Sequence, residues 1–164
     1  MINLIITKSF LFLALAIVTS KTLTITSSDF SDNGLIPSKY TCDGANINPE
    51  LTIKDIPKET ASLVLIVDDP HAPKGTFDHW VMWNIPVKDK IAENSTPGIE
   101  GKNGKGENKY TGPCPPSGAH HYHFKVYALD TKLQLAANSG KNIVLKAIEG
   151  HILASGELVG IYKK

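Results

Sequence analysis

The sequence predicts a mostly β domain, with a sandwich or barrel-like β core and one helix packed at one end. Three observations support this fold class. Several short segments are alternating or apolar runs rich in β-branched and aromatic residues, which is typical of strands. One segment near the C-terminus has apolar residues at helical spacing. No phosphate-cradling glycine motif follows a strand, which argues against a nucleotide-binding α/β sheet.

Four strands are expected in the first half of the chain. Residues 22–26 alternate in polarity, and residues 51–53 form a short extended segment. Residues 62–67 are a continuous apolar run typical of a buried strand, and residues 79–85 combine Trp and Val with alternation. Residues 31–34 and the pair Asp43-Gly44 are typical turn sequences.

The second half is expected to hold a long loop, a strand, the helix and a final strand. Residues 88–112 are polar and glycine-rich and predict little regular structure, whereas residues 122–129 are the strongest strand segment. Residues 142–154 predict the helix, from the spacing of Ile143, Leu145, Ala147, Ile148 and Ile152. Gly150 would weaken this helix by about 1 kcal/mol relative to Ala, so we interpret it as tolerated for close packing. Residues 157–162 predict the last strand.

Residues 1–20 predict a signal peptide that is removed on export to the periplasm or out of the cell. Lys8 supplies the positive n-region, residues 9–18 are apolar, and Val18 and Ser20 are small residues before a cut after position 20. The alternative is an uncleaved membrane anchor, but the apolar run is about half of the roughly 20 residues that a spanning helix needs. Residues 21–164 are then expected to form a single domain.

Composition limits the classes of partner. The chain is 41% hydrophobic and 20% charged, with a formal net charge of +1, which is ordinary for a globular domain. It has no basic block or basic–aromatic stripe, which argues against nucleic acid as a partner. No amphipathic helix of the membrane-surface type is evident, so stable membrane insertion is not expected. A homodimer is a reasonable default for a small soluble protein, although no patch in the sequence indicates one.

Cys42 and Cys114 are the only cysteines. In an exported chain they can form a disulfide, which would stabilise the fold by about 4 kcal/mol on the chain-entropy model. The alternative is two reduced thiols that simply pack. Two cysteines at this separation do not make a zinc site by themselves.

Four polar side chains are candidates for binding one phosphate or carboxylate. His120 and Tyr122 are two residues apart where a predicted strand begins, and residues i and i+2 of an extended segment emerge on the same face. His79 begins another predicted strand, and Asp69 lies in the turn before it. Protonated imidazole and phenol both donate hydrogen bonds, and a nearby carboxylate favours charged imidazole.

The residues alone leave a second interpretation open. His79 and His120 could equally be core histidines with satisfied hydrogen bonds, and Asp69 a turn cap. Under the binding interpretation, backbone N–H groups of Gly112 or Gly118 would complete a small anion nest.

Two catalytic alternatives are weaker. His121 and His123 share the opposite face of the same strand, and with His71 or an Asp they could ligate Zn or Cu. Ser117, near His120 in sequence, completes a nominal Ser/His/Asp set, but no serine lies in a Gly-x-Ser-x-Gly elbow. We therefore expect no catalytic residue, no metal and no cofactor, with a hydrolase or metalloenzyme that uses the histidine cluster as the alternative.

Several motifs together resemble the phosphatidylethanolamine-binding protein family, in its bacterial branch often called Raf kinase inhibitor-like. They are residues 40–44 (YTCDG), 68–73 (DDPHAP), 79–81 (HWV), 84–86 (NIP), 112–116 (GPCPP), 120–122 (HHY), 147–151 (AIEGH) and 158–162 (LVGIY). The resemblance covers nearly all of residues 21–164. It implies a β-sandwich with a C-terminal helix and strand, and a small cavity that binds phosphate-bearing groups.

The resemblance also implies roles for individual residues. Asp69, His79, His120 and Tyr122 match the anion-pocket residues of the family, and Pro70, Gly112 and Pro113 match the rim. The chain departs from the family where His71 replaces a usual Asp and His121 a usual Arg, so ligand preference and pH response should differ.

We therefore expect an exported, non-catalytic binding protein with a small pocket for phosphate or phosphorylated head groups. A small phosphate-bearing or carboxylate ligand is the expected partner. The resemblance further implies a kinase or protease as a protein partner that the chain modulates. The alternative of another class is a protease inhibitor that docks through its loops and leaves the pocket idle.

Overall fold

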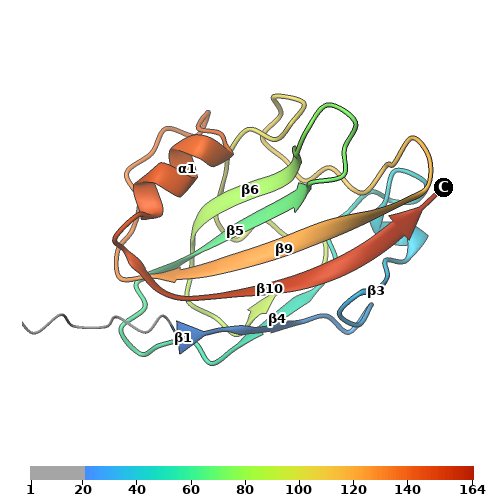
Figure 1. Ribbon diagram of the computed structural model, residues 1–164. Helices are drawn as coiled ribbons and strands as arrows, with labels where there is room; N and C mark the ends of the chain where they lie inside the picture. The colour runs from blue at the N-terminus through green and yellow to red at the C-terminus, as the bar shows by residue number, and fades with distance from the viewer. Residues whose placement is uncertain (1–20) are drawn as a thin grey trace, which may run out of the picture.

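The computed structural model describes residues 21–164, so the predicted signal peptide, residues 1–20, lies outside the described residues. Within residues 21–164, ten strands and one α-helix follow one another, with a short 3-10 helix at Ser38–Tyr40 (Figure 1). Their bounds are β1 Lys21–Thr22, β2 Thr24–Thr26, β3 Gly34–Leu35, β4 Leu51–Lys54, β5 Ser62–Asp69, β6 Phe77–Ile85, β7 Lys90–Ile91, β8 Ile99–Glu100, β9 Ala119–Leu129, α1 Lys141–Ile148 and β10 Ile152–Lys163.

The strands form two sheets. The larger has the order β1-β10-β9-β5-β6-β8, with β3 also paired to β10, and the smaller has the order β2-β4-β7. The strand predicted at residues 22–26 is divided at Leu23: β1 pairs with β10, and β2 pairs with β4. This single segment therefore passes from one sheet to the other. The loop predicted at residues 88–112 is confirmed, with only the two-residue strands β7 and β8 in it.

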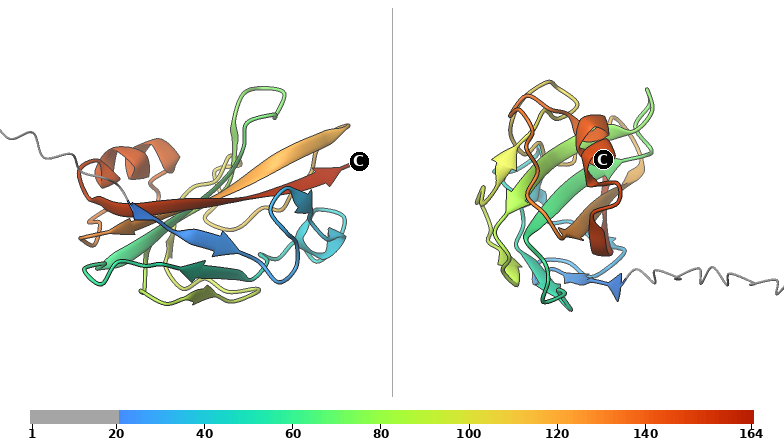
Figure 2. Two further views of the ribbon diagram at one scale, coloured as in Figure 1. Left: turned by 60° about the horizontal axis from the view of Figure 1, so that its bottom comes forward. Right: turned by 90° about the vertical axis from the view of Figure 1, so that its left-hand side faces the viewer.

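Apolar side chains fill both faces of the larger sheet. On β5, Leu63, Leu65 and Val67 point into a core shared with the smaller sheet, as side chains alternate along a strand. Val64 and Ile66 point the other way, into a second core that includes side chains of α1. Figure 2 shows α1 and the smaller sheet on opposite sides of the larger sheet. The predicted mostly β sandwich with a C-terminal helix and strand is confirmed, and residues 63–67 of β5 are an unbroken apolar run because both faces of the strand are buried.

The helix prediction is wrong at its C-terminal end. The helix ends at Ile148 instead of residue 154, and β10 begins at Ile152, five residues before the predicted strand. Gly150 has a φ of 79°, in the left-handed region that glycine adopts without strain, so it makes the turn between helix and strand. A Cβ at this position would meet no atom within 4 Å, which contradicts the interpretation of close packing.

Ion pairs attach α1 to the larger sheet. Nζ of Lys141, the first helical residue, lies 2.5 Å from Oδ1 of Asp78 and 3.3 Å from Oδ2 of Asp68. Burial by itself would lower the pKa of Lys141, but the hydrogen bonds and negative charges of the two aspartates raise it overall. Lys125 Nζ also donates to Asp68, at 2.9 Å. The charges of Asp68 and Asp78 are thus compensated on the helix side of the sheet. No helix among residues 21–164 is long and apolar enough to cross a membrane.

We expect Leu65→Ala to lower the free energy of unfolding by about 2–5 kcal/mol, because the side chain is fully buried and its removal leaves a cavity. The matched control is Leu35→Ala, because Leu35 is 64% exposed, and it should change stability by less than about 0.5 kcal/mol. Urea unfolding of the two variants and the wild type measures both. Equal losses of stability in the two variants would contradict the placement of Leu65 in the central core.

Candidate functional site

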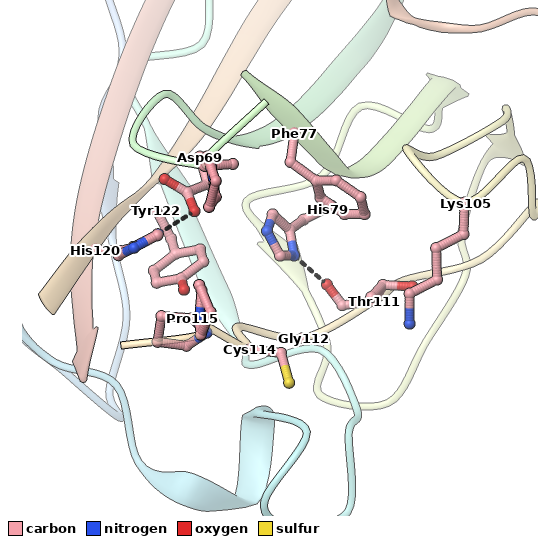
Figure 3. Close-up of a pocket in the computed structure, with 13 residues that line it drawn as sticks. Asp69, Phe77, His79, Lys105, Thr111, Gly112, Cys114, Pro115, His120 and Tyr122 are labelled. Carbon is pink, nitrogen blue, oxygen red and sulfur yellow. Dashed lines mark hydrogen bonds and ion pairs between the residues drawn. The ribbon is translucent and has the colours of Figure 1, made fainter. Parts of the chain in front are cut away.

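A cavity of about 300 Å³ lies where the C-terminal end of β5 and the N-terminal ends of β6 and β9 meet. In Figure 1 these strand ends lie away from α1. Thirteen residues line the cavity, and Figure 3 shows them: Asp69, Ala72, Pro73, Phe77, His79, Lys105, Thr111, Gly112, Cys114, Pro115, Pro116, His120 and Tyr122. All four predicted anion-pocket residues are therefore brought together, although they come from three strands.

Strand alternation places three of these four residues. On β9, His120 and Tyr122 share the face of Phe124 and Val126, which point into the core between the two sheets. On β5, Asp69 follows Leu65 and Val67 on that same face. The expectation that His120 and Tyr122 emerge side by side is confirmed.

His79 reaches the cavity by a different route. On β6, Trp80 and Met82 point into the core between the sheets, so strict alternation would turn His79 to the opposite face. The pairing of β5 with β6 shifts here: Val67 pairs with Trp80, but the next residue, Asp68, pairs with Asp78. This bulge leaves His79 unpaired and lets it share the face of Trp80.

Asp69 orients His120. Its Oδ2 lies 2.7 Å from His120 Nδ1, and its Oδ1 accepts the backbone N–H of His71 at 2.8 Å. Both carboxylate oxygens of Asp69 are therefore engaged. Asp69 holds the imidazole of His120 in place, and the two N–H groups partly compensate the negative charge of Asp69. The ring nitrogen of His120 that remains for a ligand is Nε2.

His79 has a fixed tautomer. Its Nδ1 lies 2.6 Å from the carbonyl oxygen of Thr111, and a carbonyl can only accept, so Nδ1 carries the hydrogen. Burial lowers the pKa of His79 below its ordinary value, and the hydrogen bond to Thr111 and the charge of Asp69 oppose this only in part. The neutral imidazole therefore keeps a lone pair on Nε2, the nitrogen that Figure 3 shows turned away from Thr111 towards the side of Tyr122.

The Tyr122 hydroxyl is buried, and no described residue accepts a hydrogen bond from it. Burial, and then the negative charge of Asp69, raise the pKa of Tyr122 above its ordinary value, while the backbone of Cys114 opposes the shift without reversing it. The phenol is therefore a hydrogen-bond donor throughout the physiological pH range. A buried donor of this kind costs free energy unless a ligand or water accepts from it.

The loop of residues 111–116, which covers the cavity, is anchored to residues 40–46. Cys42 and Cys114 form a disulfide, which confirms the bridge and excludes the alternative of two reduced thiols. Gly112 packs so closely that a Cβ would lie 2.4 Å from the carbonyl oxygen of Tyr40. Its N–H donates to Asn46 Oδ1 at 2.7 Å, so the expected anion nest at Gly112 is wrong. Gly118, the other expected donor, is absent from the lining.

The predicted rim is only partly found. Gly112 lines the cavity, whereas Pro70 and Pro113 do not. Sequence reasoning missed Phe77, whose ring lies edge-on to His79 with centroids 4.8 Å apart, and Thr111, whose carbonyl fixes the His79 tautomer. The DDPHAP and GPCPP motifs could have indicated four other lining residues, which are Ala72, Pro73, Pro115 and Pro116.

The catalytic alternatives gain no support from the geometry. His123 Nδ1 lies 2.6 Å from Glu157 Oε1 on the face opposite the cavity, while His121 stacks near His71 with centroids 5.0 Å apart. Within residues 21–164, no group of three or more His, Cys, Asp or Glu side chains is arranged to hold a metal ion. Ser117 is exposed and does not line the cavity beside His120.

Residues 26–163 match the family model described as phosphatidylethanolamine-binding protein. A UPF0098 protein from Pyrococcus horikoshii is 49% identical over 149 residues, which cover 84% of this chain and 75% of the relative. A UPF0098 protein from Methanothermobacter thermautotrophicus is 46% identical over 143 residues, covering 82% of this chain and 95% of the relative.

Two solved structures have the same fold. The crystal structure of a putative phosphatidylethanolamine-binding protein homolog from Chlamydia trachomatis superposes with a TM-score of 0.84 at 41% identity, covering 88% of this chain and 99% of that one. E. coli YbcL, described as a new member of the mammalian family, superposes with a TM-score of 0.80 at 28% identity, covering 87% and 98%. The motifs, the sequence matches and the fold agree on one family.

We expect the double variant Cys42→Ser/Cys114→Ser to lose about 4 kcal/mol of stability, because the bridge joins residues 72 positions apart and restricts the unfolded chain. Urea unfolding with and without a reductant measures this loss. Reductant should lower the stability of the wild type to that of the double variant and leave the variant unchanged. A wild type that is insensitive to full reduction would contradict the prediction.

His79 should make the fold less stable in acid. Its folded pKa is lower than the unfolded value of about 6.5, so the unfolded chain binds more protons and stability falls as pH drops below about 6.5. We expect His79→Asn to lose less stability than the wild type between about pH 7 and pH 5. Urea unfolding at each pH gives the comparison, and parallel pH profiles for the two proteins would contradict the assignment of a neutral His79.

Proposed function

This chain belongs to the phosphatidylethanolamine-binding protein family, and from that premise we propose that it is a non-catalytic protein that binds a small anionic group. The ligand is a phosphate, a phosphorylated head group or a carboxylate, held in the cavity between β5, β6 and β9. The closed loop of residues 111–116 and the ends of the three strands form the walls.

The single observation that carries the proposal is the buried hydroxyl of Tyr122 beside His120, whose O–H has no acceptor among residues 21–164. A donor left unsatisfied in a folded protein is costly, and a ligand that accepts from it removes that cost. His120 lines the same cavity, and its imidazolium form offers a second donor at Nε2 because Asp69 holds Nδ1. Both donors face one space, which suits an oxyanion.

Charge and size support a small ligand. The exposed side chain of Lys105 lines the cavity and adds positive charge, whereas the charge of Asp69 is already engaged by His120 and the His71 N–H. A volume of about 300 Å³ is at the lower end of the roughly 300–1,000 Å³ of ligand pockets. This space suits a phosphate or a head group and is too small for the acyl chains of a lipid.

The disulfide supports export. Cys42 and Cys114 are both exposed, and solvent-accessible disulfides persist in oxidising compartments. We therefore propose that the protein acts in the periplasm or outside the cell. The only cysteine in the cavity lining, Cys114, is bonded, so the described cavity offers no free thiol as a nucleophile.

The test is a titration of the protein with inorganic phosphate and with phosphoethanolamine, followed by the NMR signals of the histidine rings. We expect saturable shifts of His120 and His79, and a loss of affinity of at least about tenfold in His120→Ala, because a charge-assisted hydrogen bond contributes about 1.5–3 kcal/mol.

His123→Ala is the matched control. His123 lies on the same strand but on the opposite face, with Glu157 as its partner, so its removal should leave affinity within about twofold of the wild type. The proposal fails if neither anion produces saturable shifts, or if the two alanine variants bind with equal affinity.

A further inference from the structure

On the basis of the proposed function, we infer that the cavity selects oxyanions that carry a hydrogen-bond donor of their own. The P–OH group of phosphate is such a donor, whereas sulfate at neutral pH has none. The protonation state of the ligand matters because donors and acceptors occupy different parts of the cavity wall.

One wall of the cavity is an acceptor. His79 must use Nδ1 to donate to the Thr111 carbonyl, at 2.6 Å, so its only hydrogen is committed there. The opposite nitrogen, Nε2, then presents a lone pair, and the burial that lowers the pKa of His79 keeps it unprotonated. Figure 3 shows this nitrogen on the side of the ring that faces Tyr122.

The other wall is made of donors. The Tyr122 hydroxyl keeps its proton, and the ring of Tyr122 lies edge-on to that of His79 with centroids 5.1 Å apart. His120 adds Nε2–H when protonated, with Asp69 on its far nitrogen. A ligand that touches both walls therefore meets donors on one side and an acceptor on the other.

Oxyanions differ in how they meet this pattern. A ligand with only acceptor oxygens places an oxygen lone pair against the lone pair on His79 Nε2. Binding of such a ligand is strongly disfavoured, because it leaves this buried acceptor without a donor. Inorganic phosphate keeps a P–OH group at neutral pH and can donate to His79. A phosphate monoester loses its last P–OH above its second pKa of about 6.

Other charged and polar groups near His79 act on all oxyanions together. Asp69 on β5, His120 and Tyr122 on β9, and Lys105 in the loop all line the cavity. Asp68 and Asp78 also act on His79 through their charges, but they are paired with Lys141 on the helix side of the sheet. These groups set overall affinity for negative charge, whereas the His79 lone pair distinguishes protonated from unprotonated ligands.

The first experiment compares phosphate with sulfate by calorimetric titration of the wild type at pH 7 and constant ionic strength. We expect phosphate to bind at least about tenfold more tightly than sulfate. Equal affinities would overturn the inference and leave the proposed function standing. If neither anion binds, the proposed function fails and the inference fails with it.

The second experiment removes the acceptor. In His79→Asn the amide nitrogen can replace Nδ1 as the donor to Thr111, while nothing replaces Nε2. We expect the preference for phosphate over sulfate to fall to within about threefold, and His123→Asn, on the opposite face, to keep the wild-type preference. An unchanged preference in folded His79→Asn would overturn the inference.

The third experiment needs no variant and is decisive if His79→Asn does not fold. The affinity of methyl phosphate, divided by that of inorganic phosphate, is measured from about pH 5 to pH 8, across the second pKa of the monoester near 6. Overall attraction between the protein and negative charge acts on both phosphates and largely divides out of this ratio. We expect the ratio to fall at least about fivefold as the monoester loses its P–OH, and a constant ratio would overturn the inference.

Discussion

The hydrogen bond between Asp69 and His120 determines how the site is built. It joins the end of β5 to the start of β9 with 2.7 Å between Oδ2 and Nδ1, at the point where both strands leave the buried core. Because the second oxygen of Asp69 accepts from the His71 N–H, the carboxylate is fixed. It therefore fixes the His120 ring through Nδ1 and leaves Nε2 for a ligand. Within the proposed anion site, the Asp69 carboxylate therefore positions His120 and is itself compensated by two N–H donors.

The site is an extension of the core packing. Tyr122 and His120 continue on β9 the row of side chains that includes Phe124 and Val126, so the same alternation that fills the sandwich supplies the cavity with polar groups. At this end of the sheet, the apolar residues give way to polar ones, and the loop of residues 111–116 covers them. The disulfide of Cys114 and the close packing of Gly112 keep that loop rigid, which limits the entropy lost when a ligand binds.

Much of this arrangement could be predicted from the sequence. A continuous apolar run predicted β5, alternation predicted β6, and the strongest strand segment predicted β9, while the separation of two residues placed His120 beside Tyr122. The bulge that turns His79 to the cavity could not be predicted, because it depends on a register shift between β5 and β6 that the β6 pattern does not show. The helix end was missed because Ile152 continues the apolar spacing, although Gly150 in fact adopts a left-handed turn. The role of Gly112 depended on contacts with residues some 70 positions earlier, such as Tyr40 and Asn46, which no local pattern contains.

In the proposed complex, three side chains from two strands, Tyr122, His120 and His79, hold one oxyanion between donors and an acceptor. A high-resolution crystal structure of the protein soaked in phosphate tests it most directly. We expect phosphate oxygens within about 2.5–3.2 Å of Tyr122 Oη, His120 Nε2 and His79 Nε2, the normal range of hydrogen bonds. A cavity without phosphate at saturating concentration, or phosphate bound only elsewhere on the surface, would contradict the account.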